Sequence, residues 1–168
     1  LGAKNILDRI SSNKQIGLLG VNIGPNKDTN DRLNDYIECL KTFYKVADYI
    51  TINISSPNTE DLRNFHNQKK LDELLNVINK EKNKLSSKIP IVVKVSPDIN
   101  DQEIVDISDV LLSNNIEAII ISNTSDSTRD SLSDIQGHQK GGLSGKPIEE
   151  KSTELINKFY RILGNKIK

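Results

Sequence analysis

The sequence predicts an α/β protein built on a parallel sheet. Short apolar, β-branched runs alternate along the chain with longer segments of helical period. Strands and helices that alternate in this way form parallel sheets with right-handed crossover connections. The length of 168 residues is near the usual size of one domain, so we expect a single compact unit.

Each expected element has a local signal. The segment 101–113 follows Asn100, and Glu103 three residues later completes a capping-box pattern at its start. Pro147 is typical of the first turn of a helix and precedes an apolar stripe at 155–159. The remaining expected elements are a short opening helix at 3–10, strands at 17–21, 49–52, 89–93 and 118–121, and helices at 31–45 and 69–85.

Composition excludes several classes of function. Lys plus Arg number 23 and Asp plus Glu number 23, so a nucleic-acid partner, which favours a basic excess, is not expected. No apolar run approaches the roughly 18 to 20 residues of a membrane helix. Cys39 is the single cysteine, and His66 and His138 lie far apart without a ligand pattern, so neither a disulfide nor a metal site is expected. The sequence begins at Leu1 and has no Met, which indicates a processed, trimmed or partial chain.

Polar residues end the four apolar runs. They are Asn22, Asn53, Lys94 and Asn123. Ligands of parallel α/β proteins bind at the carboxyl ends of the strands. One asparagine there would be an ordinary strand terminator, but four polar residues at one end of successive strands indicate a shared site. An asparagine amide offers a donor and an acceptor in one plane, as the edge of a heterocycle requires.

Two loops add candidates. The segment 53–59 follows the second run, and both Ser56 and Asn58 could project into the crevice, although capping hydroxyls in a turn are the common alternative. The glycine-rich segment 141–145 precedes a helix, where backbone amides can approach a ligand. It lacks the spacing of a P-loop or a dinucleotide fingerprint.

Five segments together resemble one family. They are residues 20–29, 52–59, 93–98, 122–124 and 141–145, and they resemble class 2, quinone-dependent dihydroorotate dehydrogenases. These are FMN enzymes of pyrimidine biosynthesis built on a (β/α)8 TIM barrel. The resemblance implies that residues 1–168 are the central part of a single FMN-binding barrel domain, covering about four βα units, from the third to the sixth strand.

The resemblance also implies roles for individual residues. Ser56 takes the place of the catalytic base, where class 1 relatives have Cys. The implied FMN contacts are Asn22, Asn53, Lys94, Ser122 and Gly145, and the implied substrate contacts are Asn53, Asn58, Asn123 and Thr124.

The implied reaction is oxidation of (S)-dihydroorotate to orotate with a quinone as electron acceptor. Membrane association, at the bacterial or mitochondrial inner membrane, is implied only through upstream segments that this sequence does not include. The 168 residues themselves are expected to be soluble.

Two other interpretations remain open. One is another FMN barrel acting on pyrimidines, such as a dihydropyrimidine dehydrogenase-like domain, and Ser56 in place of Cys counts against it. The other is a non-catalytic half-barrel that binds a ligand or pairs with another half, since an unclosed sheet leaves edges that invite pairing.

Overall fold

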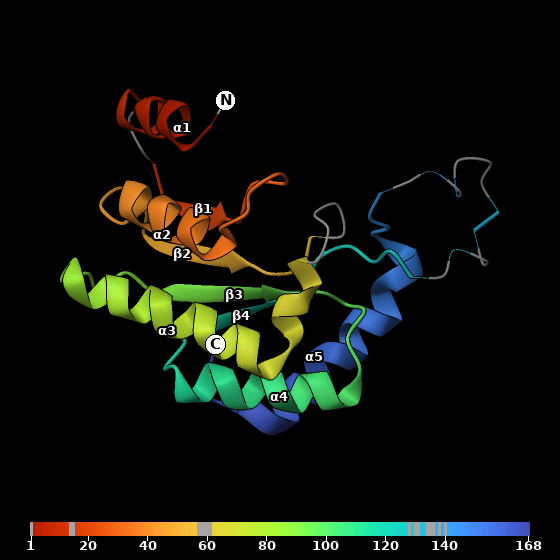
Figure 1. Ribbon diagram of the computed structural model, residues 1–168. Coiled ribbons are helices and arrows are strands. Elements are labelled where there is room, and N and C mark those ends of the chain that lie inside the picture. Colours follow the sequence, from red (N-terminus) through yellow and green to blue (C-terminus); the bar gives the residue numbers. More distant parts are fainter. Residues whose placement is uncertain are drawn as a thin grey trace.

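The predicted α/β class is confirmed. The computed structural model describes residues 2–13, 16–56, 62–127, 129, 132–133, 137, 139 and 141–168. Within these ranges, one sheet holds four parallel strands, and the arrows of β2 and β3 point toward the same end in Figure 1. The strands are β1 (Gly20–Ile23), β2 (Tyr49–Asn53), β3 (Ile91–Val95) and β4 (Ala118–Ile121).

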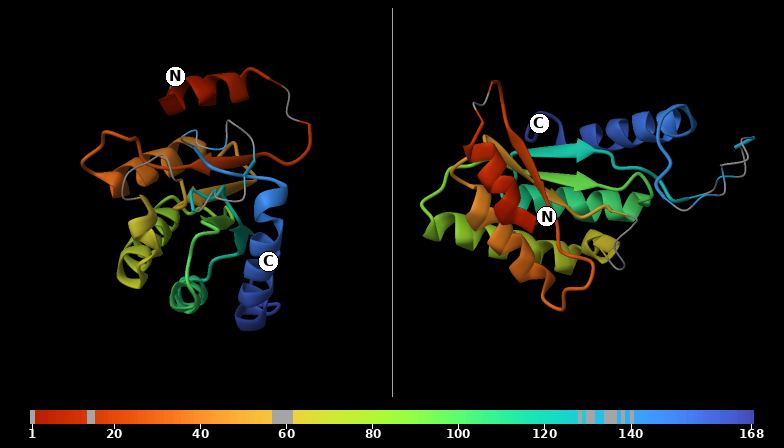
Figure 2. Two further views of the ribbon diagram at one scale, coloured as in Figure 1. Left: turned by 90° about the vertical axis from the view of Figure 1, so that its right-hand side faces the viewer. Right: turned by 90° about the horizontal axis from the view of Figure 1, so that it is seen from above.

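Helices connect successive strands. In Figure 2, α2, α3 and α4 follow one another around one side of the sheet, and neighbouring helices are in contact. The helices are α1 (Gly2–Ser11), α2 (Arg32–Phe43), α3 (Gln68–Lys84), α4 (Asp101–Ser113) and α5 (Glu149–Leu163), with short 3-10 turns η1 (Leu62–His66) and η3 (Lys146–Ile148). None of the helices within the described ranges combines the length and apolar character needed to cross a membrane.

The strand order identifies the type of sheet. Each strand pairs with the next one along the chain, in the order β1-β2-β3-β4. A doubly wound sheet instead reverses its order at a switch point. Sequential parallel strands with helices along one side form an arc of the wall of a β/α barrel.

Local sequence explains the best-defined helix start. Asn100 Oδ1 accepts a hydrogen bond from the Glu103 amide at 3.0 Å, and Glu103 Oε2 accepts one from the Asn100 amide at 2.8 Å. The predicted capping box is therefore present, and α4 begins and ends at the predicted residues.

The first strand begins later than expected. The prediction placed it at 17–21, but Gly17 has φ 88° and Leu18 is 86% exposed, so this apolar stretch lies outside the sheet. The strand starts at Gly20, where an added Cβ would come within 2.1 Å of the Tyr49 ring. Leucine is apolar enough to suggest a strand, but its burial depends on neighbours that periodicity does not show.

The two faces of the sheet differ in character. Ile50, Ile52, Val93 and Val95 are fully buried in the core that the helices cover. Because side chains alternate between faces, the residues between them lie on the other face. That opposite face carries Asn22, Thr51, Asn53, Val92 and Lys94, so it becomes polar toward the carboxyl ends of the strands.

Candidate functional site

The predicted polar residues gather at the carboxyl edge of the sheet. Asn53 is the last residue of β2 and lies opposite Lys94 in the strand register. Paired residues of parallel strands point to the same face, so both side chains lie on the face of the sheet opposite the helix-covered core. Asn22 and Lys94 each precede the final residue of their strands, because β1 and β3 end two residues later than the predicted 21 and 93. Asn123 lies just beyond β4.

A buried serine joins two of these strand ends. Ser55 is fully buried, and its hydroxyl donates to Asn53 Oδ1 at 2.9 Å while accepting from Asn123 Nδ2 at 3.0 Å. The Ser55 amide also donates to Asn53 Oδ1, at 3.2 Å. The hydrogen-bonded chain Asn53–Ser55–Asn123 therefore spans the ends of β2 and β4 and sets the orientation of both amides.

A tyrosine of α2 holds the end of β2 from the helix-covered side of the sheet. The Tyr36 hydroxyl donates to the Asn53 carbonyl at 2.7 Å, and its ring meets the Phe65 ring edge-on at a centroid distance of 6.0 Å. Tyr36 is fully buried, and burial raises the pKa of its phenol well above the ordinary value, despite the opposing effect of Arg32. The phenol therefore stays a neutral donor at physiological pH.

The loop after β4 is held against the glycine-rich segment. Asn123 Oδ1 accepts from the Thr124 amide at 2.8 Å. The main chains of Ser125 and Leu143 exchange two hydrogen bonds, at 2.9 and 2.6 Å. A Cβ at Gly142 would lie 1.8 Å from Thr124 Oγ1, so only glycine allows this approach. The loop after β4 and the glycine-rich segment thus meet at the carboxyl edge of the sheet.

Gly145 ends this segment with an unusual backbone conformation. Its φ is 79°, in the region that favours glycine, and a Cβ there would meet no atom within 4 Å. A ligand could approach the main chain at this position. Ser122, on the strand side of the loop, is half-buried, and its hydroxyl donates to the Asn123 carbonyl at 3.1 Å.

The predicted base and the lysine are placed at the same edge. Ser56 is half-buried and directly follows Ser55, whereas the predicted substrate contact Asn58 lies outside the described residues. Lys94 is half-buried. Among the residues that the structure describes, no ion pair or hydrogen bond involves its ammonium group. A half-buried cation without a protein partner suits an anionic or electron-rich ligand.

Two residues of this edge were not predicted from the sequence. Ser55 and Tyr36 have no motif of their own, yet they hold the two asparagine amides and the end of β2. Asn53 itself was a signal, because Asn favours Asx turns, in which its side-chain oxygen accepts from the amide two residues later, here that of Ser55. Tyr36 could not be found this way, since its partner is distant in sequence.

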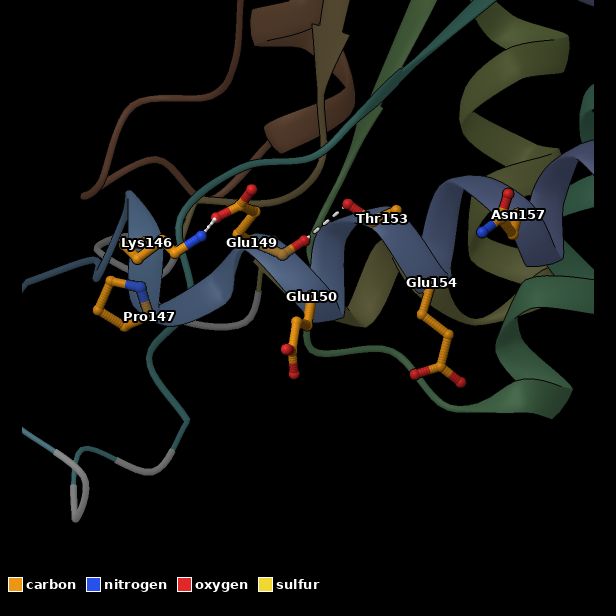
Figure 3. Close-up of a pocket in the computed structure, with 7 residues that line it drawn as sticks. All are labelled: Lys146, Pro147, Glu149, Glu150, Thr153, Glu154 and Asn157. Atoms are coloured by element: carbon orange, nitrogen blue, oxygen red, sulfur yellow. Dashed lines mark hydrogen bonds and ion pairs between the residues drawn. The ribbon is translucent and has the colours of Figure 1, made fainter.

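A hollow on the outside of the molecule is not part of this edge. It has a volume of about 580 Å³ and lies along the start of α5 (Figure 3). Three carboxylates line it, those of Glu149, Glu150 and Glu154, and Lys146 is already paired with Glu149 at 2.5 Å. This lining repels an anion. Within the described ranges, no His, Cys, Asp and Glu side chains form a group that could hold a metal ion.

The described strands and helices define a segment of a β/α barrel wall with polar side chains at its carboxyl edge. Comparison with known proteins makes this specific: the family described as dihydroorotate dehydrogenase matches residues 1–168, and the chain belongs to that family. A "Dihydroorotate dehydrogenase (quinone)" of Wigglesworthia glossinidia brevipalpis is 43% identical over 173 residues, and one of Bartonella henselae is 38% identical over 170. The predicted family resemblance is confirmed.

Solved structures agree with this assignment. The crystal structure of DHODH from Eimeria tenella in complex with ferulenol has a TM-score of 0.92 and 29% identity, and the ligand-free form has 0.91 and 30%. Each similarity covers 99% of this chain, but 52% and 53% of those chains. The two bacterial relatives are covered over 51% and 47% of their length. The chain thus spans about half the length of the relatives that it matches.

Proposed function

We propose that residues 1–168 form the central part of the FMN-binding barrel domain of a quinone-dependent dihydroorotate dehydrogenase. The reaction is the oxidation of (S)-dihydroorotate to orotate, with a quinone as electron acceptor, in pyrimidine biosynthesis. Membrane association belongs to this proposal through segments outside the 168 residues.

The observation that carries the proposal is the convergence of polar groups at one edge. Asn53 and Asn123 share Ser55 as a hydrogen-bond partner, and Lys94 lies opposite Asn53. Relatives named as quinone-dependent enzymes match the chain over 99% of its length, including every element that builds this edge. Together these findings favour a shared ligand over four unrelated strand terminators.

The chemistry of these groups fits a flavin beside a pyrimidine. Bound FMN would supply the two-electron acceptor chemistry, which no amino-acid side chain provides. Lys94 offers a cation without a protein partner among the described residues, and Asn22, Asn53 and Ser122 offer neutral polar groups at the same end of the sheet. Open space beside Gly145 leaves room for a ligand to approach the main chain.

Side chains of this chain would accept the proton and orient the substrate. Ser56 Oγ accepts the proton from C5 of dihydroorotate; because a hydroxyl is a weak base, this step needs a hydrogen-bonded acceptor beyond it. The amides of Asn53 and Asn123 hold the edge of the pyrimidine, each supplying a donor and an acceptor in one plane. Thr124 completes the substrate contacts, and we extend the same role to Asn58 by family resemblance.

The alternative is a non-catalytic half-barrel, which would have no need for a base at Ser56. The test uses the full gene product, purified and assayed for orotate formation from dihydroorotate with a short-chain quinone. Fumarate and NAD as acceptors are the controls for the choice of oxidant, and Ser56→Ala is the control for the chemistry. Yellow protein with quinone-dependent orotate formation is expected. A colourless protein, or a yellow one without orotate formation, contradicts the proposal.

The isolated 168 residues provide a further check. In this proposal they supply the edge for the flavin ring, and their described residues form a four-stranded parallel sheet. Phosphate sites of β/α barrels are frequently built by the loops of the last two strands, which this sheet does not contain. We therefore expect FMN fluorescence to show no saturable quenching at micromolar concentrations of the isolated chain. Saturable quenching would show that half a barrel suffices for binding.

A further inference from the structure

A second polar cluster, formed by residues of the loops that follow the strands, is centred on the carboxylate of Asp98. This side chain follows β3 and is 10% exposed. Its Oδ1 accepts hydrogen bonds from Ser125 Oγ at 2.6 Å and from Lys151 Nζ at 2.5 Å. Its Oδ2 accepts one from the Asp126 amide at 2.9 Å and lies 3.2 Å from Arg63 Nη2.

The four partners of Asp98 come from three other segments of the carboxyl edge. Arg63 belongs to η1, which follows the segment that begins at Ser56. Ser125 and Asp126 directly follow Asn123 and Thr124. Lys151 lies in the first turn of α5, shortly after the glycine-rich segment. One carboxylate therefore ties together the loops that leave β2, β3 and β4, and the start of the helix beyond them.

Both oxygens of the Asp98 carboxylate are engaged by members of the cluster. Ser127 Oγ shares a hydrogen bond with Ser125 Oγ at 2.7 Å and accepts one from Lys151 Nζ at 3.1 Å, and Arg63 also pairs with Asp126. Burial alone would raise the pKa of Asp98, but hydrogen bonds from Lys151, Ser125 and the Asp126 amide outweigh it and hold that pKa well below its ordinary range. The carboxylate is ionised and fully engaged, so the cluster is suited to fixing loops.

We propose that Asp98 is a positioning residue for substrate binding. It holds the loop that carries Asn123 and Thr124 in place, through Ser125 and the Asp126 amide, and anchors that loop to η1 through Arg63. This proposal rests on the proposed function, because it takes Asn123 and Thr124 as substrate contacts. Substrate affinity then depends on a carboxylate that does not touch the substrate.

A matched control exists in the same part of the fold. Asp101 is the first residue of α4 and forms an ion pair with Lys158 of α5 at 2.8 Å. It thus joins the same two parts of the chain as the Asp98–Lys151 pair. Asp101 is highly exposed, and its ion pair involves no residue of the strand-end loops. Asp101→Asn therefore makes the same chemical change without disturbing those loops.

The experiment compares Asp98→Asn, Ser125→Ala and Asp101→Asn in the full gene product loaded with FMN. Two quantities are measured: hydrogen–deuterium exchange of residues 122–127, and steady-state kinetics with dihydroorotate. For Asp98→Asn we expect exchange of the Asp126 amide to be at least about tenfold faster and KM to rise about tenfold, the effect of losing about 1.4 kcal/mol. FMN content and kcat should change less than KM, because the loop affects binding rather than the redox step. Ser125→Ala should shift both quantities in the same direction by a smaller factor, and Asp101→Asn should leave both unchanged.

Several results would overturn the proposal. Unchanged exchange in Asp98→Asn shows that the carboxylate does not hold the loop, and faster exchange with an unchanged KM shows that the loop does not govern substrate binding. An equal rise of KM in Asp101→Asn shows a general loss of stability. If Asp98→Asn does not fold, Ser125→Ala decides by the same two measurements. Exchange requires no activity, so it judges the hold of Asp98 on the loop even where absent orotate formation refutes the proposed function.

Discussion

Replacing the buried serine that links the two asparagines is the sharpest test of the site geometry. Ser55→Ala removes the hydrogen bonds to Asn53 Oδ1 and from Asn123 Nδ2. Each hydrogen bond contributes about 0.5–1.5 kcal/mol net, so the expected loss in the free energy of unfolding is about 1–3 kcal/mol. Partial compensation remains, because Asn53 Oδ1 keeps the Ser55 amide and Asn123 Oδ1 keeps the Thr124 amide.

Urea unfolding followed by circular dichroism measures this loss. In a domain of 150–250 residues, about 1 kcal/mol lowers Tm by roughly 2–4 °C, so thermal unfolding should show a fall of several degrees. Ser113→Ala is the control: its hydroxyl also takes part in a hydrogen bond, which it donates to the Asp109 carbonyl, but Ser113 is exposed at the end of α4. Its effect should stay within about 0.5 kcal/mol. If both variants have the same stability, Ser55 does not hold the amides, and the interpretation of this edge as a preorganised site is wrong.

Three further predictions concern single residues at or near the site. Ser56→Ala should slow flavin reduction by dihydroorotate at least ~10²-fold in stopped-flow absorbance while FMN stays bound, and an unchanged rate would remove Ser56 from the mechanism. Lys94→Ala should lower both the FMN content after purification and the turnover rate, whereas full flavin content with normal turnover would make the lysine structural. Burial, reinforced by the Arg63 charge, lowers the pKa of His66 from 6.5 to about 4, so the unfolded chain binds more protons between these values. The free energy of unfolding should therefore fall as the pH is lowered from about 6.5 to about 4, and urea titrations should show a flatter pH dependence for His66→Gln; equal slopes would contradict this.

The sequence predicted the parts of the fold that depend on local patterns. Asn100 and Glu103 make their capping box within one turn, so the start of α4 could be predicted to the residue. The position of β1 could not, because Leu18 is as apolar as a strand residue and only the Tyr49 ring over Gly20 shows where the sheet begins. Periodicity identifies an element better than it places its ends.

The candidate site divides in the same way. Asn53, Lys94 and Asn123 were predicted because each lies near the end of an apolar run, and the topology of parallel strands brings such ends together. The contacts that hold them were not predicted. Asp98 accepts a hydrogen bond from Lys151, which lies 53 residues further along the chain, and no local sequence pattern connects the two. Such long-range pairs follow only from the three-dimensional packing of the loops.

The sequential strand order also has a consequence for how the chain folds. Each of the four described strands hydrogen-bonds to the next one along the chain. Pairing a strand with the next one along the chain closes a shorter loop than pairing it with a more distant strand, so its loop-closure cost is smaller. During synthesis, β1 and α2 can meet β2 as soon as it leaves the ribosome, and each later βα unit can add to an edge that already exists. The edge strand at any moment is then a template for the next unit, and the sheet grows in the direction of translation.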